Sequence, residues 1–155
     1  MGSMSDMHQP GMHHMGEGHH ERMQAMHDTD AAVIDTTAIL QAYAEAIDAE
    51  DMVAMEALVL ADERFSVIEG GHANWGWVDY RDNHLGPEFA SERISFHTYG
   101  YSDINVRVGH VFAYATFSYA FEATLDGEPY NKEGLGTAVL RRTADGWRIT
   151  HLQTS

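Results

Sequence analysis

The chain has 155 residues, and 44% of them are hydrophobic, which is enough for one domain with a buried core. Its 24 Asp and Glu residues against nine Lys and Arg residues give a formal net charge of -15. Such a surface repels phosphate backbones and anionic lipid, so nucleic-acid and membrane roles are not expected. The absence of cysteine excludes disulfides, thiolate metal sites and a cysteine nucleophile.

The first 28 residues have no apolar periodicity and are rich in Gly, His and Met. They are therefore predicted to form a flexible leader ahead of one folded domain over residues 29–155. Met1-Gly2-Ser3 is typical of an expression scar, and no signal peptide is visible. A periplasmic or secreted location is favoured if a signal peptide has been removed. The segment His19–His27 contains good helix formers and can extend the next element, whose cap is predicted at Thr29 or Asp30.

The leader holds six of the 11 histidines and seven of the nine methionines. Thioether and imidazole ligands without thiols suit copper in both oxidation states. The histidines form no unbroken run of the kind used for purification, and the leader resembles those of bacterial periplasmic copper-handling proteins. The alternative is a solvated tail that binds metal adventitiously. The predicted metal ligands are Met7, His8, Met12, His13, His14, Met15, His19 and His20.

Two helices and a hairpin are predicted after the leader. Residues 28–51 place Val33, Leu40 and Tyr43 at helical spacing, and residues 52–63 form a shorter amphipathic segment. Residues 64–77 have the pattern of two strands around Gly70-Gly71.

The rest of the chain is predicted to be one short helix and then only strands. "VDYRDNHLGPEF" favours a helix that ends at Gly86-Pro87. Four long runs rich in β-branched and aromatic residues follow, and "LDGEP" and "ADG" between them are typical of tight hairpin turns. Helices followed by an antiparallel meander predict an α+β fold, with the helices on one face of a curved sheet.

The closing segment "GLGTAVLRRTADGWRITHLQTS" resembles the end of nuclear transport factor 2-like domains, in their SnoaL-like and ketosteroid-isomerase-like branch. The association domain of calcium/calmodulin-dependent kinase ends in a similar strand. The resemblance implies a cone whose wide end opens into an apolar pocket, used by relatives as isomerases, cyclases, dehydratases, binding modules or hubs. The second histidine of the family's His-x-His pair is Gln153 here, so a two-histidine site is absent. The residues that carry the resemblance are Gly134, Thr137, Arg141, Arg142, Trp147, Ile149, His151 and Ser155.

Strand alternation predicts which side chains face this pocket. Trp147 and Ile149 share a face with His151 and Gln153, so the last two are predicted to point inward. His151 is the candidate catalytic residue, and a histidine bonded at the cone floor is the alternative. The other predicted pocket walls, which could equally be core residues, are Tyr43, Trp75 and Trp77.

Two further features concern the outer surface and the acid–base chemistry. Alternation places His97 outward unless a bulge intervenes. The run from Val111 to Phe121 is apolar on both faces, which predicts a homodimer through the outer one. Ketosteroid-isomerase chemistry needs a pocket carboxylate, and Glu69, Asp79 and Glu133 are available without a motif that selects one.

The sequence thus supports two functions. One is a small-molecule binding protein or enzyme of the SnoaL-like class, which would take a hydrophobic ligand in the cone. The other is a copper-binding accessory protein that uses the leader, with the cone as a dimeric scaffold.

Overall fold

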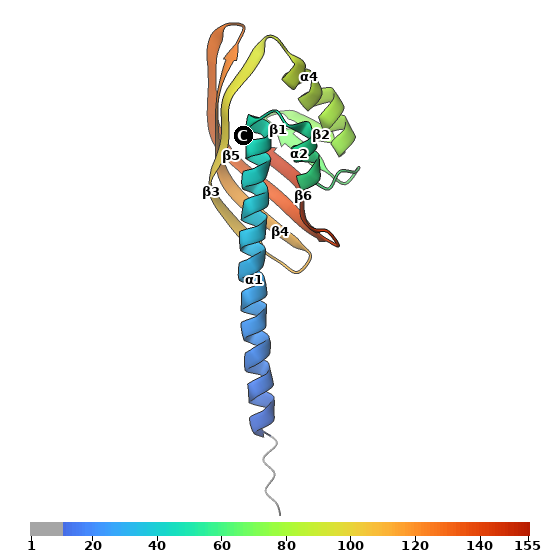
Figure 1. The fold of residues 1–155 in the computed structure, drawn as a ribbon, viewed down its shortest axis with the longest axis vertical. Coiled ribbons are helices and arrows are strands. Elements are labelled where there is room, and N and C mark those ends of the chain that lie inside the picture. The colour runs from blue at the N-terminus through green and yellow to red at the C-terminus, as the bar shows by residue number, and fades with distance from the viewer. Residues whose placement is uncertain (1–10) are drawn as a thin grey trace, which may run out of the picture. The chain divides into compact units, whose positions relative to one another are not determined.

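The structure is a computed structural model, which describes the backbone of residues 11–155 and the side chains from Gly18 onward. The chain divides into two compact units, with the boundary after Ala32. None of the helices among the described residues is both long and apolar enough to cross a bilayer. The elements, drawn in Figure 1, are α1 (Gly11–Asp48), α2 (Met52–Leu58), β1 (Ser66–Glu69), β2 (His72–Trp75), α3 (Trp77–Tyr80), the π-helical turn η1 (Arg81–Leu85), α4 (Gly86–Ala90), β3 (Ile94–Val108), β4 (Phe112–Leu125), β5 (Glu128–Thr143) and β6 (Gly146–Thr154).

Six strands form one sheet in the order β2-β1-β6-β5-β4-β3. Neighbours run antiparallel except β1 and β6, which pair in parallel. The long strands bend along their length (Figure 1), so the sheet is curved. At the two predicted tight turns, Asp126, Gly127 and Gly146 take positive φ angles of 51°, 83° and 107°. The α+β prediction is confirmed, as are the β1–β2 hairpin and the four long strands.

One face of the sheet, called the inner face below, carries the hydrophobic core. On β4, Ala113, Ala115 and Phe117 alternate inward and are at most 2% exposed. A Cβ atom at Gly136 on β5 would overlap the ring of Phe117, so only glycine leaves room for that ring across the strand. The core therefore depends on close contact between an aromatic side chain and bare backbone.

Helix α1 begins before the predicted cap. It starts at Gly11 and includes His19–His27, for which the sequence allowed a helical extension. The cap predicted at Thr29 or Asp30 is wrong, because the Thr29 hydroxyl donates to the Ala25 carbonyl (2.8 Å) as a residue inside a helix does. In the second unit, the helix buries Leu40 and Tyr43.

The helical segment after β2 does not end at Gly86-Pro87 as predicted. It continues as α4, because η1 inserts a wider turn in which the Gly86 N–H donates to the Arg81 carbonyl, five residues back. Proline breaks an α-helix through its missing N–H and through a clash with the carbonyl four residues back. A π turn next to it changes that local geometry, so the chain remains helical through Pro87.

Candidate functional site

A cavity of about 400 Å³ lies between the inner face of the sheet and the helical segment formed by α3, η1 and α4. Most of its wall is apolar or aromatic, and its polar side chains come from different elements. Its polar and ionisable wall residues include Glu69 on β1, Tyr80 on α3, His84 on η1, Glu88 on α4, Tyr99 on β3 and Lys132 on β5.

Three of these residues form what we call the Glu69–His84–Glu88 cluster. His84 Nε2 lies 3.3 Å from Glu69 Oε2 and 3.3 Å from Glu88 Oε2. The Tyr80 hydroxyl donates to Glu69 Oε1 (2.9 Å), so both carboxylate oxygens of Glu69 are engaged. The imidazole therefore bridges two carboxylates at the cavity wall.

The cluster holds His84 as an imidazolium. Hydrogen bonds to Glu69 and Glu88 raise the pKa of His84 from 6.5 to about 10, against the opposing effect of partial burial. Its other nitrogen, Nδ1, lies 3.0 Å from Asn74 Oδ1, and the Asn74 amide donates to Asp79 (3.0 Å). Asn74 thus presents an acceptor to His84, as an imidazolium with two N–H donors requires.

Glu69 is held as a carboxylate. Burial raises the pKa of Glu69, but the hydrogen bonds from His84 and Tyr80 and the positive charge of Lys132 outweigh it, so the pKa lies below its ordinary value. A carboxylate at an apolar cavity wall can accept a proton from a bound molecule.

Local sequence explains the placement of these residues. Val67 and Glu69 alternate on β1 toward the inner face, where they pair with Leu152 and Thr154. His84 and Glu88 are four residues apart in the helical segment and lie on one side of it.

Aromatic side chains form another part of the cavity wall. The Tyr99 and Phe121 rings stack with centroids 6.0 Å apart, and Phe96 meets Phe121 edge to face at 5.5 Å. A register shift at His97 lets both Phe96 and Tyr99 face inward. The Tyr99 N–H donates to Asp48 Oδ1 at the end of α1 (2.8 Å), which fixes the strand at this point.

The prediction that His151 and Gln153 face the cavity is wrong. A register shift in β6 between Ile149 and His151 reverses the alternation, so that Leu152 is buried instead. His151 pairs with Val139 on the outer face, and its Nδ1 lies 2.7 Å from the Ser66 hydroxyl. Burial lowers the pKa of His151. Gln153 is exposed.

The three predicted aromatic walls lie in different places. Tyr43 and Trp77 are core residues, each 1% exposed, and Trp77 Nε1 donates to Glu56 (2.7 Å). Among the described residues, the Tyr43 hydroxyl makes no hydrogen bond of good geometry. Burial raises the pKa of Tyr43, the nearby Tyr99 and Glu69 raise it further, and an interaction with the Tyr80 side chain opposes them. Trp75 is 69% exposed and pairs with Ser66, which places it on the outer face.

Of the three candidate carboxylates, only Glu69 lines this cavity. Asp79 binds Asn74 and Asn83, and Glu133 is exposed on β5. His97 is exposed, with Nε2 2.7 Å from the Thr124 hydroxyl, so the outward alternative holds even though a bulge intervenes.

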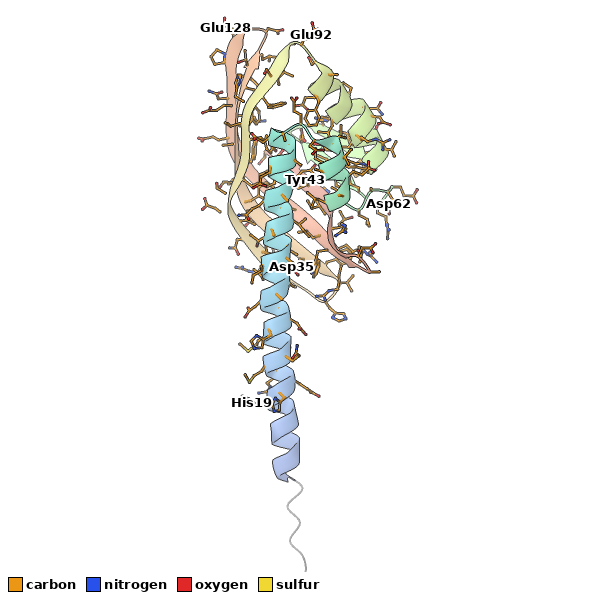
Figure 2. All side chains as sticks on the ribbon, viewed as in Figure 1. His19, Asp35, Tyr43, Asp62, Glu92 and Glu128 are labelled. Atoms are coloured by element: carbon orange, nitrogen blue, oxygen red, sulfur yellow. The ribbon has the colours of Figure 1, made fainter. Side chains whose placement is uncertain are left out.

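The predicted metal ligands fall mostly outside the described residues. Met7 and His8 precede them, and the side chains of Met12, His13, His14 and Met15 are likewise not described. His19 and His20 are exposed on α1 (His19 is labelled in Figure 2). From Gly18 onward, no group of three or more His, Asp or Glu residues is arranged to hold a metal ion.

Sequence reasoning missed His84, Glu88 and Lys132. The spacing of His84 and Glu88 was a usable signal, because residues four apart on a helix are neighbours. For Lys132 the signal was alternation with Tyr130 on β5, which places both side chains on the inner face.

Comparisons with known proteins agree with this architecture. The family model of the SnoaL-like domain matches residues 36–155 of this chain. No curated protein matches the chain in sequence.

Solved structures with the same fold are similar at low identity. A nuclear transport factor 2-like superfamily protein from Salmonella enterica serovar Typhimurium is 22% identical, with a TM-score of 0.73 over 82% of this chain and 92% of that one. A ketosteroid isomerase-like protein from Erwinia carotovora atroseptica is 21% identical, with a TM-score of 0.60 over 82% and 92%. The association domain of the Caenorhabditis elegans kinase CaMKII is 17% identical, with a TM-score of 0.62 over 83% and 98%.

Proposed function

We propose that this chain, which belongs to the SnoaL-like domain family, binds a hydrophobic small molecule in its cavity. Glu69 acts on that molecule as a general base. The observation that carries this proposal is the Glu69 carboxylate, ionised by His84 and set in a largely apolar and aromatic wall. Concave, mostly apolar sites with a few convergent polar groups are typical of ligand pockets.

The reaction class that suits this wall is proton abstraction next to a carbonyl group. Glu69 would take the proton, and negative charge would develop on the carbonyl oxygen. Lys132 supplies a positive charge at the β5 wall, which favours a negative charge that develops on a nearby oxygen. His84 remains protonated and keeps Glu69 in the form that accepts a proton.

Titration with a bicyclic aromatic ketone, 2-tetralone, tests where a ligand binds. We expect methyl signals of the cavity residues Ile47, Ile94 and Leu125 to shift in carbon–proton NMR spectra. Ile68 and Leu135 face the other side of the sheet, and their methyl signals serve as controls. Shifts confined to the controls, or none at all up to the solubility limit of the ketone, would contradict binding in the cavity.

The outer face of the sheet supports a homodimer. Large apolar residues on it are exposed, including Tyr114 at 51%, Leu135 at 67% and Trp75 at 69%. Several large apolar side chains exposed on one face are typical of interaction sites. The similarity to an association domain also supports an oligomer.

Leu135→Glu tests this interface. We expect the wild-type chain to be a dimer at micromolar concentration by light scattering, and the variant to be a monomer, because a charge would be buried without a partner. Val53→Glu is the matched control, since Val53 is 82% exposed on α2, outside the sheet. A wild-type monomer, or a variant that stays dimeric, would exclude this interface.

A second function, copper handling by the leader, rests on the ligand chemistry of residues 4–27. Their methionines and histidines offer soft thioethers and imidazoles, which together can bind Cu(I) and Cu(II). The full chain should therefore bind more copper than a chain that lacks residues 1–27. Equal copper uptake by the two proteins would place the metal in residues 28–155 instead.

A further inference from the structure

The described part of the leader has a pattern that its composition does not require. At about 100° of rotation per residue, five side chains between Gly18 and Thr29 fall within an arc of about 120° on α1. These five are all the histidines and methionines of that segment, and each is exposed: His19, His20, Met23, Met26 and His27.

The rest of the helix surface at this point is different in kind. Glu21, Gln24 and Asp28 project from the other side, and the Gln24 amide donates to Asp28 (3.1 Å) there. The helix is therefore divided lengthwise into a hydrogen-bonded polar side and a side of soft metal ligands. We call the second side the Met/His face.

Met23 is the central residue of the Met/His face. His19 lies four residues before it and His27 four residues after it, so each imidazole is about 5–6 Å from Met23 between Cβ atoms. Side chains on a helix lean toward its N-terminus, which brings His27 toward Met23 and Met23 toward His19. Met23 is 46% exposed, so its side chain is accessible from solvent.

We propose that the Met/His face binds a soft monovalent ion, Cu(I), through the thioether of Met23 and the imidazole of His27, which lies one turn after it and leans toward it. This inference rests on the proposed copper function and names its ligands. Thioether sulfur selects Cu(I) over harder divalent ions, and with no cysteine in the chain no thiolate competes for the ion. The preformed helix places these two ligands one turn apart on the same face.

The experiment uses the full chain with methionine methyl groups labelled with carbon-13 and Ag(I) as a redox-inert probe for Cu(I). We expect the Met23 methyl signal to shift at the first equivalent, while Met55, which is 0% exposed in the core, stays unchanged. Met23→Leu should weaken Ag(I) binding by about tenfold or more, since even loss of a residue that only supports a ligand commonly costs that much. Met52→Leu, outside the leader, is the matched control.

Two outcomes separate this inference from the copper function itself. Shifts confined to Met4, Met7, Met12 and Met15, with affinity unchanged in Met23→Leu, would overturn the Met/His face and leave the copper function standing. No shift in any methionine would overturn both.

Discussion

Replacing Glu69 with Gln should slow proton exchange on a bound ketone by about 100-fold to 10,000-fold, the usual contribution of a general base. The amide keeps the size of the side chain and can still accept a hydrogen bond from Tyr80, but it cannot take up a proton. The measurement is the exchange of the acidic hydrogens of 2-tetralone for deuterium in heavy water, followed by proton NMR.

Glu133→Gln is the matched control for Glu69→Gln, because Glu133 is a carboxylate on the same sheet that faces away from the cavity. Equal exchange rates in the two variants would contradict the role of Glu69. If 2-tetralone binds but no protein accelerates exchange, the cavity belongs to a binding protein rather than to an enzyme.

Replacing His84 with Gln should lower the free energy of unfolding by about 3 kcal/mol at pH 6. A pKa raised from 6.5 to about 10 corresponds to roughly 5 kcal/mol of favourable interaction. The side chains of Glu69 and Glu88 are 38% and 28% exposed, so solvent screens part of this. The variant also removes the cation that lies between the carboxylates of Glu69 and Glu88.

The pH dependence of stability gives the same interaction a second test. His84 has a higher pKa in the folded chain than in the unfolded one, so its contribution is fully present below about pH 6.5. It is lost as the pH rises from there through about 10. Urea unfolding between pH 6 and 10 should therefore show a decline in the wild-type chain that is much weaker in His84→Gln.

His97→Gln is the control for this series. His97 is exposed, and its ring hydrogen-bonds the neutral Thr124 hydroxyl rather than a carboxylate. It should keep the wild-type decline. A wild-type stability that stays level across this range would show that His84 is not an imidazolium in the folded chain.

The fold was predictable because its strands are long and its turns have clear chemistry. The alternation on β4 and the glycines at the hairpin turns indicated an antiparallel meander after the helices. The register shifts at His97 in β3 and at Thr150 in β6 were harder to predict, since each reverses alternation within a single strand. In both strands, two large nonpolar side chains three residues apart, Phe96 and Tyr99 or Ile149 and Leu152, face inward. Strict alternation cannot bury both members of such a pair, and that spacing is the signal for a bulge.

The candidate site was predictable only in part for the same reason. Glu69 was among the available carboxylates, but the unshifted alternation of β6 pointed to His151 rather than to a histidine on a helix. His84 depends on the π turn, and Gly86-Pro87 reads as the end of a helix in sequence. The contact between β1 and η1 joins Glu69 to His84, which are 15 positions apart in the chain. Neither the strand pattern around Glu69 nor the helix pattern around His84 predicts this contact.

The buried hydroxyl of Tyr43, whose position on α1 is labelled in Figure 2, has only a weak interaction with Tyr80, so it marks a place where the core can be stabilised. A buried donor that is left unsatisfied costs about 1–3 kcal/mol. A phenyl ring of the same shape would remove the part of that cost that Tyr43 bears. Tyr43→Phe, which removes this oxygen atom, is therefore a more direct route to thermal stabilisation than a surface substitution. The Tyr43 side chain also interacts electrostatically with Tyr99 and Glu69, which line the cavity. Removing its hydroxyl would therefore change the polarity beside the cavity. A substitution at Tyr43 that raises thermal stability would therefore also act on the surroundings of Glu69.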